Sequence, residues 1–232
     1  MKSKKDKFLV VAPHQDDEVI GCGGTILKLL DMDIEGYVVH VFSGSSGISG
    51  CSSPVKSKKI RNAEAKKASE IGGYTLLKNL GCKDRDSNVN FIVHSLIEVV
   101  REVKPDFIFS PHSEEADFEH SLVSQASWEA SWLATTGIFP ELGPPSHPVD
   151  VFLGYEVWTP IQNISCFIDV TEHISKKKRM LEAFKSQMQT TSWVEGSVGL
   201  NSYRGTTLQG YGYAEAFTLK KTSGVAAEKI FS

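Results

Sequence analysis

The chain has 232 residues, 41% of them hydrophobic and 23% charged, with a formal net charge of −3. This composition is ordinary for a soluble globular protein, and the charge balance argues against a nucleic-acid-binding surface. No apolar run approaches the roughly 18 residues that a membrane span needs, and Cys22, Cys51, Cys82 and Cys166 form no C-x-x-C pair, so we expect a cytoplasmic protein with free thiols.

Strands and helices alternate along the first part of the chain. Hydrophobic runs predict strands at residues 8–12, 36–43, 74–80 and 106–111, and helical periodicity predicts helices at 19–31, 55–73, 89–103 and about 120–136. Such alternation is typical of β-α-β units, whose right-handed connections build a parallel sheet covered by helices on both faces. We therefore predict an α/β protein, a three-layer α/β/α sandwich with a Rossmann-like, mostly parallel sheet.

The pattern changes after the Gly/Pro-rich segment "GIFPELGPPSHP". Shorter strands are expected in "VFLGYEVW", "ISCFIDV" and "YAEAFTLKK", with one helix in "HISKKKRMLEAFKSQMQ". Neither a linker nor an internal repeat separates the two parts. We therefore predict a single domain over 1–232, in which 1–136 forms the doubly wound core, 137–224 adds strands and a helix that complete the site, and 225–232 is a surface tail.

Polar segments follow three of the predicted strands. "PHQDDE" comes after the first strand, "SGSSG" after the second and "PHSEEADFEH" after the fourth. In open α/β sheets the ligand crevice lies beyond the carboxyl ends of the strands. These three segments should therefore meet at one edge of the sheet and form a site.

The residue types at this edge are suited to a catalytic zinc ion. His14 and Asp17 are three residues apart, so one tight turn can aim both inward, and either His120 or His112 can supply a third ligand. Imidazole and carboxylate ligands without thiolate match a catalytic site with an open position for water. Asp16, beside the ligands, is free to take a proton from the activated water.

Two other interpretations of "PHQDDEVIGCGGT" were weighed against a metal site. An acidic loop can serve only to cap the next helix, because Asp favours helix N-termini. The glycines can suggest a dinucleotide loop, but the G-x-G-x-x-G order is absent and the two aspartates would repel a pyrophosphate.

The same stretch resembles the P/A-H-P-D-D-E signature of the LmbE-like (PIG-L-like) N-deacetylases. "RNAEAKKASEIGG", with Arg61 and Glu64, is similar to the R-x-x-E helix of that family, and "PHSEEADFEH" stands where the family carries its H-x-D-H segment. "GYEVW", "FIDVTEH", "SQ" and "YAEAF" follow in the family's order. The resemblance thus runs through most of the chain.

The resemblance implies a zinc-dependent hydrolase that removes an N-acetyl or other N-acyl group from an amino sugar or sugar conjugate. Carried over by position, His14, Asp17 and His120 would bind Zn²⁺, Asp16 would be the general base, and Arg61 would contact the substrate. The expected partner is a small N-acylated molecule, with neither nucleic acid nor a membrane span involved, and a homo-oligomer is compatible with the sequence.

Two positions depart from the family pattern. Gln15 stands where proline is usual, and Asp117 stands where the first histidine of H-x-D-H assists the oxyanion or the leaving group. An anion cannot stabilise a developing oxyanion, so His112 or another donor takes that role, or Asp117 acts while protonated. We expect Asp117 to orient a ligand histidine through its second ring nitrogen, and we count Asp117 and His112 with Arg61 as substrate-binding residues. The alternative function is a family member with altered catalysis, acting on a non-sugar amide or serving as a carbohydrate-binding or regulatory protein.

Overall fold

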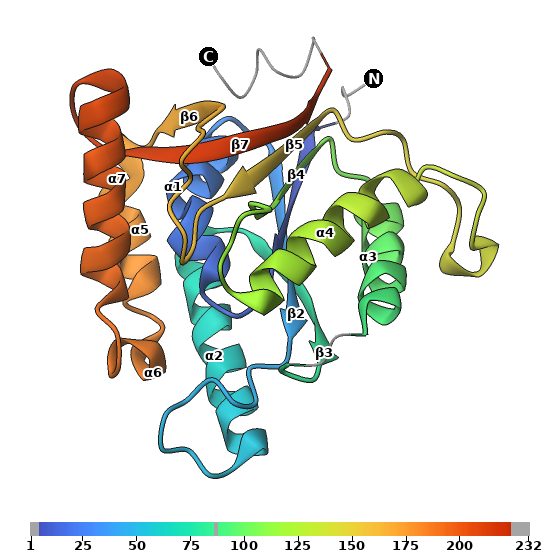
Figure 1. Ribbon diagram of the computed structural model, residues 1–232, viewed down its shortest axis with the longest axis horizontal. Coiled ribbons are helices and arrows are strands. Elements are labelled where there is room, and N and C mark those ends of the chain that lie inside the picture. Colours follow the sequence, from blue (N-terminus) through green and yellow to red (C-terminus); the bar gives the residue numbers. More distant parts are fainter. Residues whose placement is uncertain (1–4, 86–87, 224–232) are drawn as a thin grey trace.

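The computed structural model describes residues 5–85 and 88–223, so the predicted tail at 225–232 lies outside the described residues. Within these ranges a seven-stranded sheet has the order β3-β2-β1-β4-β5-β7-β6 and is covered by helices on both faces (Figure 1). The strands are β1 (Lys7–Ala12), β2 (Glu35–Phe42), β3 (Thr75–Cys82), β4 (Phe107–Pro111), β5 (Val151–Tyr155), β6 (Cys166–Asp169) and β7 (Ala214–Thr222).

The helices follow the strands in regular alternation until β5. They are α1 (Asp17–Asp31), α2 (Pro54–Gly72), α3 (Val89–Val103), α4 (Phe118–Leu133), α5 (Ile174–Leu181), α6 (Lys185–Met188) and α7 (Trp193–Gln209), with short 3-10 turns η1 (Pro140–Leu142) and η2 (Thr171–His173). β1 to β5 pair in parallel, and β7 runs antiparallel to both of its neighbours. The predicted α/β/α sandwich with a mostly parallel sheet is confirmed.

Each face of the sheet has its own hydrophobic core. Alternate residues of β1 point to opposite faces: Phe8 and Val10 pack with α1, α2 and α5, whereas Leu9 and Val11 pack with α3 and α4. Strands buried on both faces have continuous apolar sequences, which is why "FLVVA" shows no alternation.

The C-terminal part differs from the prediction in its helices. The expected single helix at 173–189 is divided into η2, α5 and α6, because Phe184 leaves the helical conformation with φ −85° and ψ 57°. The helix α7 was not predicted. Its buried residues are Ser197, Asn201, Arg204 and Gly205, so the helix has no apolar stripe for a sequence pattern to reveal.

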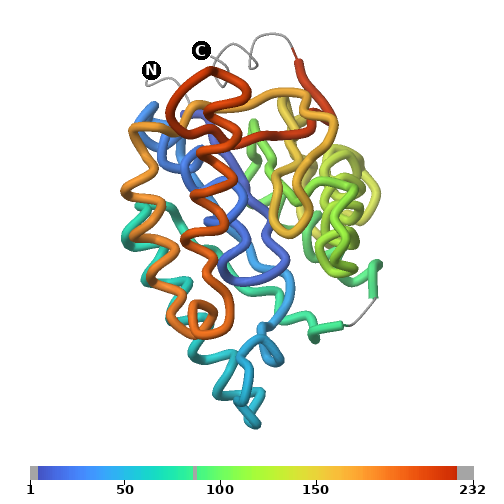
Figure 2. The backbone as a smooth tube through the Cα atoms, turned by 60° about the vertical axis from the view of Figure 1, so that its left-hand side comes forward, coloured from blue at the N-terminus to red at the C-terminus, as the bar shows by residue number. Residues whose placement is uncertain are grey.

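The sheet order places a crevice between β1 and β4. The chain proceeds outward from β1 to β2 and β3 and then crosses back to β4 on the other side of β1, which is the topological switch where α/β proteins bind ligands. The loops after these strands lie at the edge toward which the arrows of β2 and β3 point in Figure 1. In Figure 2 the loop between β2 and α2, with the first turns of α2, projects from the body of the protein at this edge.

Candidate active site

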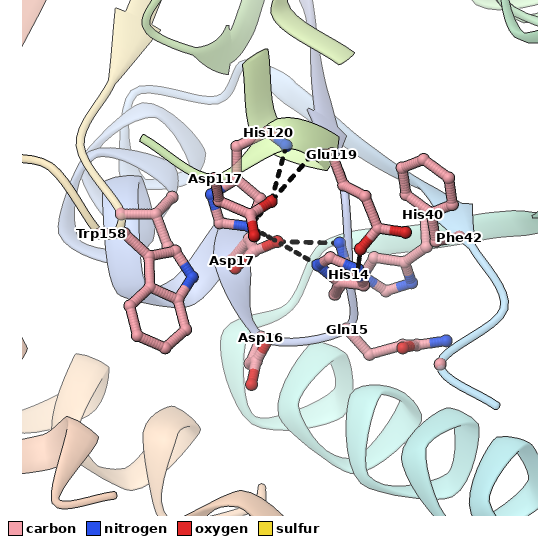
Figure 3. Close-up of polar contacts among 12 residues, drawn as sticks. His14, Gln15, Asp16, Asp17, His40, Phe42, Asp117, Glu119, His120 and Trp158 are labelled. Atoms are coloured by element: carbon pink, nitrogen blue, oxygen red, sulfur yellow. Dashed lines mark hydrogen bonds and ion pairs between the residues drawn. The ribbon is translucent and has the colours of Figure 1, made fainter. Parts of the chain in front are cut away.

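His14, Asp17 and His120 meet at the crevice between β1 and β4. Asp17 begins α1, and its Oδ2 accepts the backbone N–H of His14 at 2.8 Å and lies 3.3 Å from His14 Nδ1. His120, in the first turn of α4, brings Nε2 to 3.4 Å from the same oxygen. Figure 3 shows the three side chains converging on one another. The crossover topology thus brings together residues that are more than 100 positions apart.

This set of donors fits a divalent metal ion. Tetrahedral zinc, with bonds of about 2.0–2.2 Å, separates its ligand atoms by about 3.3–3.6 Å. The distances from the Asp17 oxygen to the two imidazole nitrogens are 3.3 and 3.4 Å, and one ligand atom from each residue lies within 4.8 Å of the others. Two imidazoles and one carboxylate, without thiolate, are typical of a catalytic zinc site that keeps an open position.

A second carboxylate faces the other ring nitrogen of each histidine. Glu119 Oε2 lies 2.9 Å from His14 Nε2, and Glu115 Oε2 lies 3.7 Å from His120 Nδ1. Carboxylates in this position fix the tautomer and orientation of metal-binding histidines and make them better ligands. Neither glutamate was predicted as a site residue from the sequence. The signal was present, because both lie in "PHSEEADFEH", but sequence spacing does not show which carboxylate faces which ring.

Asp117 has a role other than the one expected from the sequence. It is the N-cap of α4, and its Oδ1 accepts the backbone N–H groups of Glu119 at 2.9 Å and His120 at 3.1 Å. The prediction that it orients a histidine through the second ring nitrogen is wrong, because Glu119 and Glu115 occupy those positions. Asp117 instead holds the helix turn that carries His120.

The electrostatics of the three residues favour a bound cation. Burial by itself would lower the pKa of His14, but hydrogen bonds to Asp17 and Glu119 outweigh it and raise that pKa to about 10. Burial likewise opposes a positive His120, yet the Asp17 carboxylate raises its pKa. Burial would raise the pKa of Asp17, but the charge on His120 and the hydrogen bond to His14 hold it well below its usual range. A divalent metal at this position would replace the protons that these imidazoles otherwise hold.

Asp16 lies beside the three residues in a strained conformation. Its φ of 132° is one that residues other than glycine rarely adopt, and such strain is usually kept at functional sites. Its side chain does not cap α1 but instead accepts a hydrogen bond from Arg61 Nη2 at 3.0 Å. Burial raises the pKa of Asp16 to about 7 even though the Arg61 charge opposes this shift. The alternative interpretation, in which Asp16 serves only as a side-chain cap of the helix, therefore does not apply.

Arg61 reaches the site from α2 and is 4% exposed. Besides Asp16, its Nη2 donates to the backbone oxygen of Gln15, whereas Nε has no hydrogen-bond partner. A Cβ atom at Gly47 would lie 2.3 Å from Arg61 Nη1, so a larger residue in the loop after β2 would displace the guanidinium. The buried Nε of Arg61 thus has no partner among the described residues.

The buried side chains of Glu18 and Gln15 hold the loop between β1 and α1 in place. Glu18 Oε2 accepts the Asp16 N–H at 3.2 Å and lies 3.1 Å from His40 Nε2, and its other oxygen accepts the Tyr74 hydroxyl at 3.0 Å. Gln15, where the family pattern has proline, donates through its amide to the Ser43 carbonyl at 3.2 Å. Gln15 thus supplies by hydrogen bonding the rigidity that a proline ring supplies covalently.

A small pocket of about 70 Å³ opens over these residues. Its lining residues are His14, Asp16, Asp17, Ile20, Arg61, Trp158, Gln187 and Trp193. The last three come from the second half of the chain, and sequence reasoning named neither Gln187 nor Trp193 as a site residue. His112 does not join this group: its Nε2 donates to the Thr159 carbonyl at 2.7 Å, and its Nδ1 accepts the Glu114 N–H at 3.3 Å.

Comparison with known proteins adds an independent observation. The family model described as PIG-L, GlcNAc-PI de-N-acetylase, matches residues 9–131. A diacetylchitobiose deacetylase from Thermococcus kodakarensis is 26% identical over 196 residues, which cover 81% of this chain and 72% of the relative. A probable N-acetyl-alpha-D-glucosaminyl L-malate deacetylase 2 from Bacillus cereus is 32% identical over 116 residues, 46% of this chain, which span about half (51%) of the relative.

A solved structure shares the fold but has another activity in its name. GalB, the 4-carboxy-2-hydroxymuconate hydratase from Pseudomonas putida, superposes with a TM-score of 0.79 at 22% identity, covering 95% of this chain and 98% of that one. This likeness shows the fold alone, so the reaction has to be argued from the site residues.

In the part of the chain that the structure describes, none of the helices has the length and apolarity to cross a membrane.

Proposed function

The chain belongs to the PIG-L family of GlcNAc-PI de-N-acetylases, and from this we propose that it is a metal-dependent hydrolase that removes the N-acetyl group of an amino sugar or sugar conjugate. The observation that carries the proposal is the group formed by the three convergent ligands and the buried Asp16 beside them. His14, Asp17 and His120 would hold the metal, which would supply Lewis-acid polarisation of the acyl oxygen and a lowered pKa of water.

Asp16 then moves the proton. It accepts the proton of the attacking water as the water oxygen bonds to the acyl carbon, and it returns that proton to the nitrogen as the carbon–nitrogen bond breaks. The products are a carboxylic acid and an amine, which become a carboxylate and an ammonium ion when the acid's remaining proton passes to the amine at neutral pH. In the metal-free protein burial raises the pKa of Asp16 to about 7, and a group in this range can serve as a base and then protonate an amine as an acid.

Arg61 and the carboxylates behind the histidines hold this arrangement. The hydrogen bond from Arg61 fixes one oxygen of Asp16, and Arg61 also lines the pocket over the ligands, which supports a contact between its guanidinium and the substrate. Glu119 orients the His14 imidazole through a 2.9 Å contact, and Glu115 supplies a negative charge 3.7 Å from His120 Nδ1. A substrate contact by Asp117 or His112 stays a prediction, and the cap and backbone contacts of these residues support positioning roles instead.

The two halves of the chain work as one domain in this proposal. The ligands come from the first half, whereas Trp158, Gln187 and Trp193 close the pocket from the second. A carbohydrate-binding protein without catalysis would have no use for a buried, strained aspartate paired with an arginine, so these features favour the enzyme.

Amine release from N-acetylglucosamine, its disaccharide and its simple glycosides tests the proposal. The metal-loaded protein should release amine and acetate in equal amounts. The double variant His14→Ala, His120→Ala should bind no metal and release neither, and His173→Ala, which changes a histidine paired with Asp31 outside the site, serves as the control. Equal amine release by the double variant would overturn the assignment of the site.

A further inference from the structure

We propose that a groove between α7 and the loop after β5 binds an uncharged alkyl or aryl group of the substrate, next to the reacting amide. This inference rests on the proposed function and names the substrate class more closely. The groove has a volume of about 210 Å³, against about 70 Å³ for the pocket over the metal ligands. The two share Ile20, Trp158 and Trp193 as walls, so a substrate held at the metal ligands extends directly into the groove.

One face of α7 forms the first wall. Trp193, Gly196, Ser197, Leu200 and Asn201 follow the spacing i, i+3, i+4, i+7 and i+8, so they lie on one side of the helix. The segment from Glu156 to Pro160, which follows β5, forms the opposite wall, and the start of α1 forms the base. Figure 1 shows α7 standing at the side of the sheet that α1 and α5 also cover.

The charged and amide or hydroxyl side chains of the groove, Glu156, Asn201 and Ser197, already have partners within the protein. Ser197 donates to the Ile20 carbonyl at 3.0 Å, Asn201 accepts from Lys177 at 2.7 Å, and Glu156 pairs with Arg204. The groove therefore offers a ligand no free charge. A phosphate or carboxylate would meet no cation there, and only the two indole N–H groups could replace the hydrogen bonds that a second sugar ring makes to water.

What remains accessible is aromatic and aliphatic surface. Trp158 is 58% exposed, and its ring meets that of Trp193 edge-on, with centroids 4.9 Å apart and an angle of 87° between the planes. The Trp158 backbone is fixed, because Glu115 accepts its N–H at 3.0 Å and that of Val157 at 2.7 Å. In Figure 3 the Trp158 ring stands beside Asp17, at the border of the metal site. A rigidly held, exposed indole next to a reaction site is suited to cover an apolar group of the substrate.

Two series of substrates test this inference and distinguish the two ends of the amide. One series lengthens the acyl group, from N-acetyl to N-butyryl and N-hexanoyl glucosamine. The other keeps N-acetyl and changes the glycoside from methyl to butyl, hexyl and phenyl. Burial of each methylene is expected to raise kcat/KM about threefold to fourfold in one of the series. A flat profile in both series, with an enzyme that releases amine from the short substrates, would overturn the inference and leave the proposed function standing.

Glycine positions on α7 supply a matched pair of variants. A Cβ at Gly196, which lines the groove, or at Gly199, which does not, would meet no atom within 4 Å. Gly196→Leu should fill the groove. The kcat/KM of the six-carbon substrate (N-hexanoyl or hexyl glycoside) divided by that of the shortest member of the same series should then be close to one. Gly199→Leu changes the same helix in the same way but should keep the parent ratio. An unchanged ratio in Gly196→Leu contradicts the inference.

A binding measurement keeps the inference testable if no substrate is hydrolysed, an outcome that would count against the proposed function. Titration with hexyl N-acetylglucosaminide should quench tryptophan fluorescence with at least tenfold higher affinity than the methyl glycoside. The gain should be lost in Gly196→Leu and kept in Gly199→Leu. Equal affinity of the parent protein for both glycosides, together with equal affinity for N-acetyl and N-hexanoyl glucosamine, would overturn the proposed groove.

Discussion

Replacement of Asp16 by asparagine separates the proposed proton carrier from the metal ligands beside it. An asparagine Oδ1 can still accept the Arg61 hydrogen bond that Asp16 accepts at 3.0 Å, and the side chain keeps its size. The ligand set of His14, Asp17 and His120 is untouched. The variant should therefore fold and bind metal, but the amide cannot take a proton from water.

Loss of a general base typically lowers the rate by ~10²–10⁴-fold. At about 1.36 kcal/mol per tenfold, this raises the activation free energy by roughly 3–5 kcal/mol. The assay measures kcat/KM for amine release by proteins whose metal content has been matched. The control is Asp117→Asn, the same chemical change at an N-cap whose side chain is 41% exposed. Because asparagine caps helices about as well as aspartate, the control should keep kcat/KM within about threefold.

Two results would refute this reasoning. Asp16→Asn with bound metal and more than a tenth of the parent kcat/KM would mean that another group carries the proton. Loss of turnover in Asp117→Asn as complete as in Asp16→Asn would mean that Asp117 itself takes part in proton transfer and is more than a helix cap.

Three further predictions concern metal affinity and stability. Glu119→Gln should weaken metal binding about 10–100-fold, because the Glu119 carboxylate lies 2.9 Å from His14 Nε2 and orients that ligand. Competition with a chromogenic chelator measures the metal affinity, and an unchanged affinity would contradict the orienting role of Glu119. The pKa values of His14 and His120 are raised in the metal-free protein, so each imidazole stays protonated to higher pH. Metal affinity should therefore fall by about tenfold per pH unit below these pKa values for each proton that the metal displaces. Calorimetry in two buffers should detect the released protons, and a pH-independent affinity would contradict the prediction. Lys177→Met should lower the free energy of unfolding by about 3–5 kcal/mol, because it removes the cation that pairs with the Glu215 carboxylate where both side chains are fully buried. Urea denaturation measures this change, and a loss below 1 kcal/mol would show that Glu215 is neutral or hydrated.

The layers of the fold and the convergence of three side chains could be predicted from the sequence for related reasons. The strand runs are continuous because both faces of the sheet are buried, and the strands alternate with helices at β-α-β spacing. Residues just after β1 and β4 must lie at one edge of a parallel sheet, so His14 and His120 could be brought together before any coordinates were known.

The remaining features depend on contacts that no local pattern contains. Glu115 and Glu119 were invisible as partners of the histidines, because whether they face an imidazole depends on how the start of α4 is turned. The same geometry made Asp117 a helix cap. The helix α7, which carries Trp193, could not be predicted from the sequence, because its buried face is polar and sequence periodicity detects only apolar faces.

Titration of the metal-free protein with Zn²⁺, with amine release from an N-acetylated amino sugar followed at each step, tests the central claim most directly. The account predicts that activity is absent without metal, rises in proportion to added Zn²⁺ and reaches its maximum at one equivalent per chain. His14→Ala should remove this response at stoichiometric metal. Full activity of the metal-free protein, or equal activity of His14→Ala at one equivalent, would contradict the claim that these residues form a metal-dependent deacetylase site.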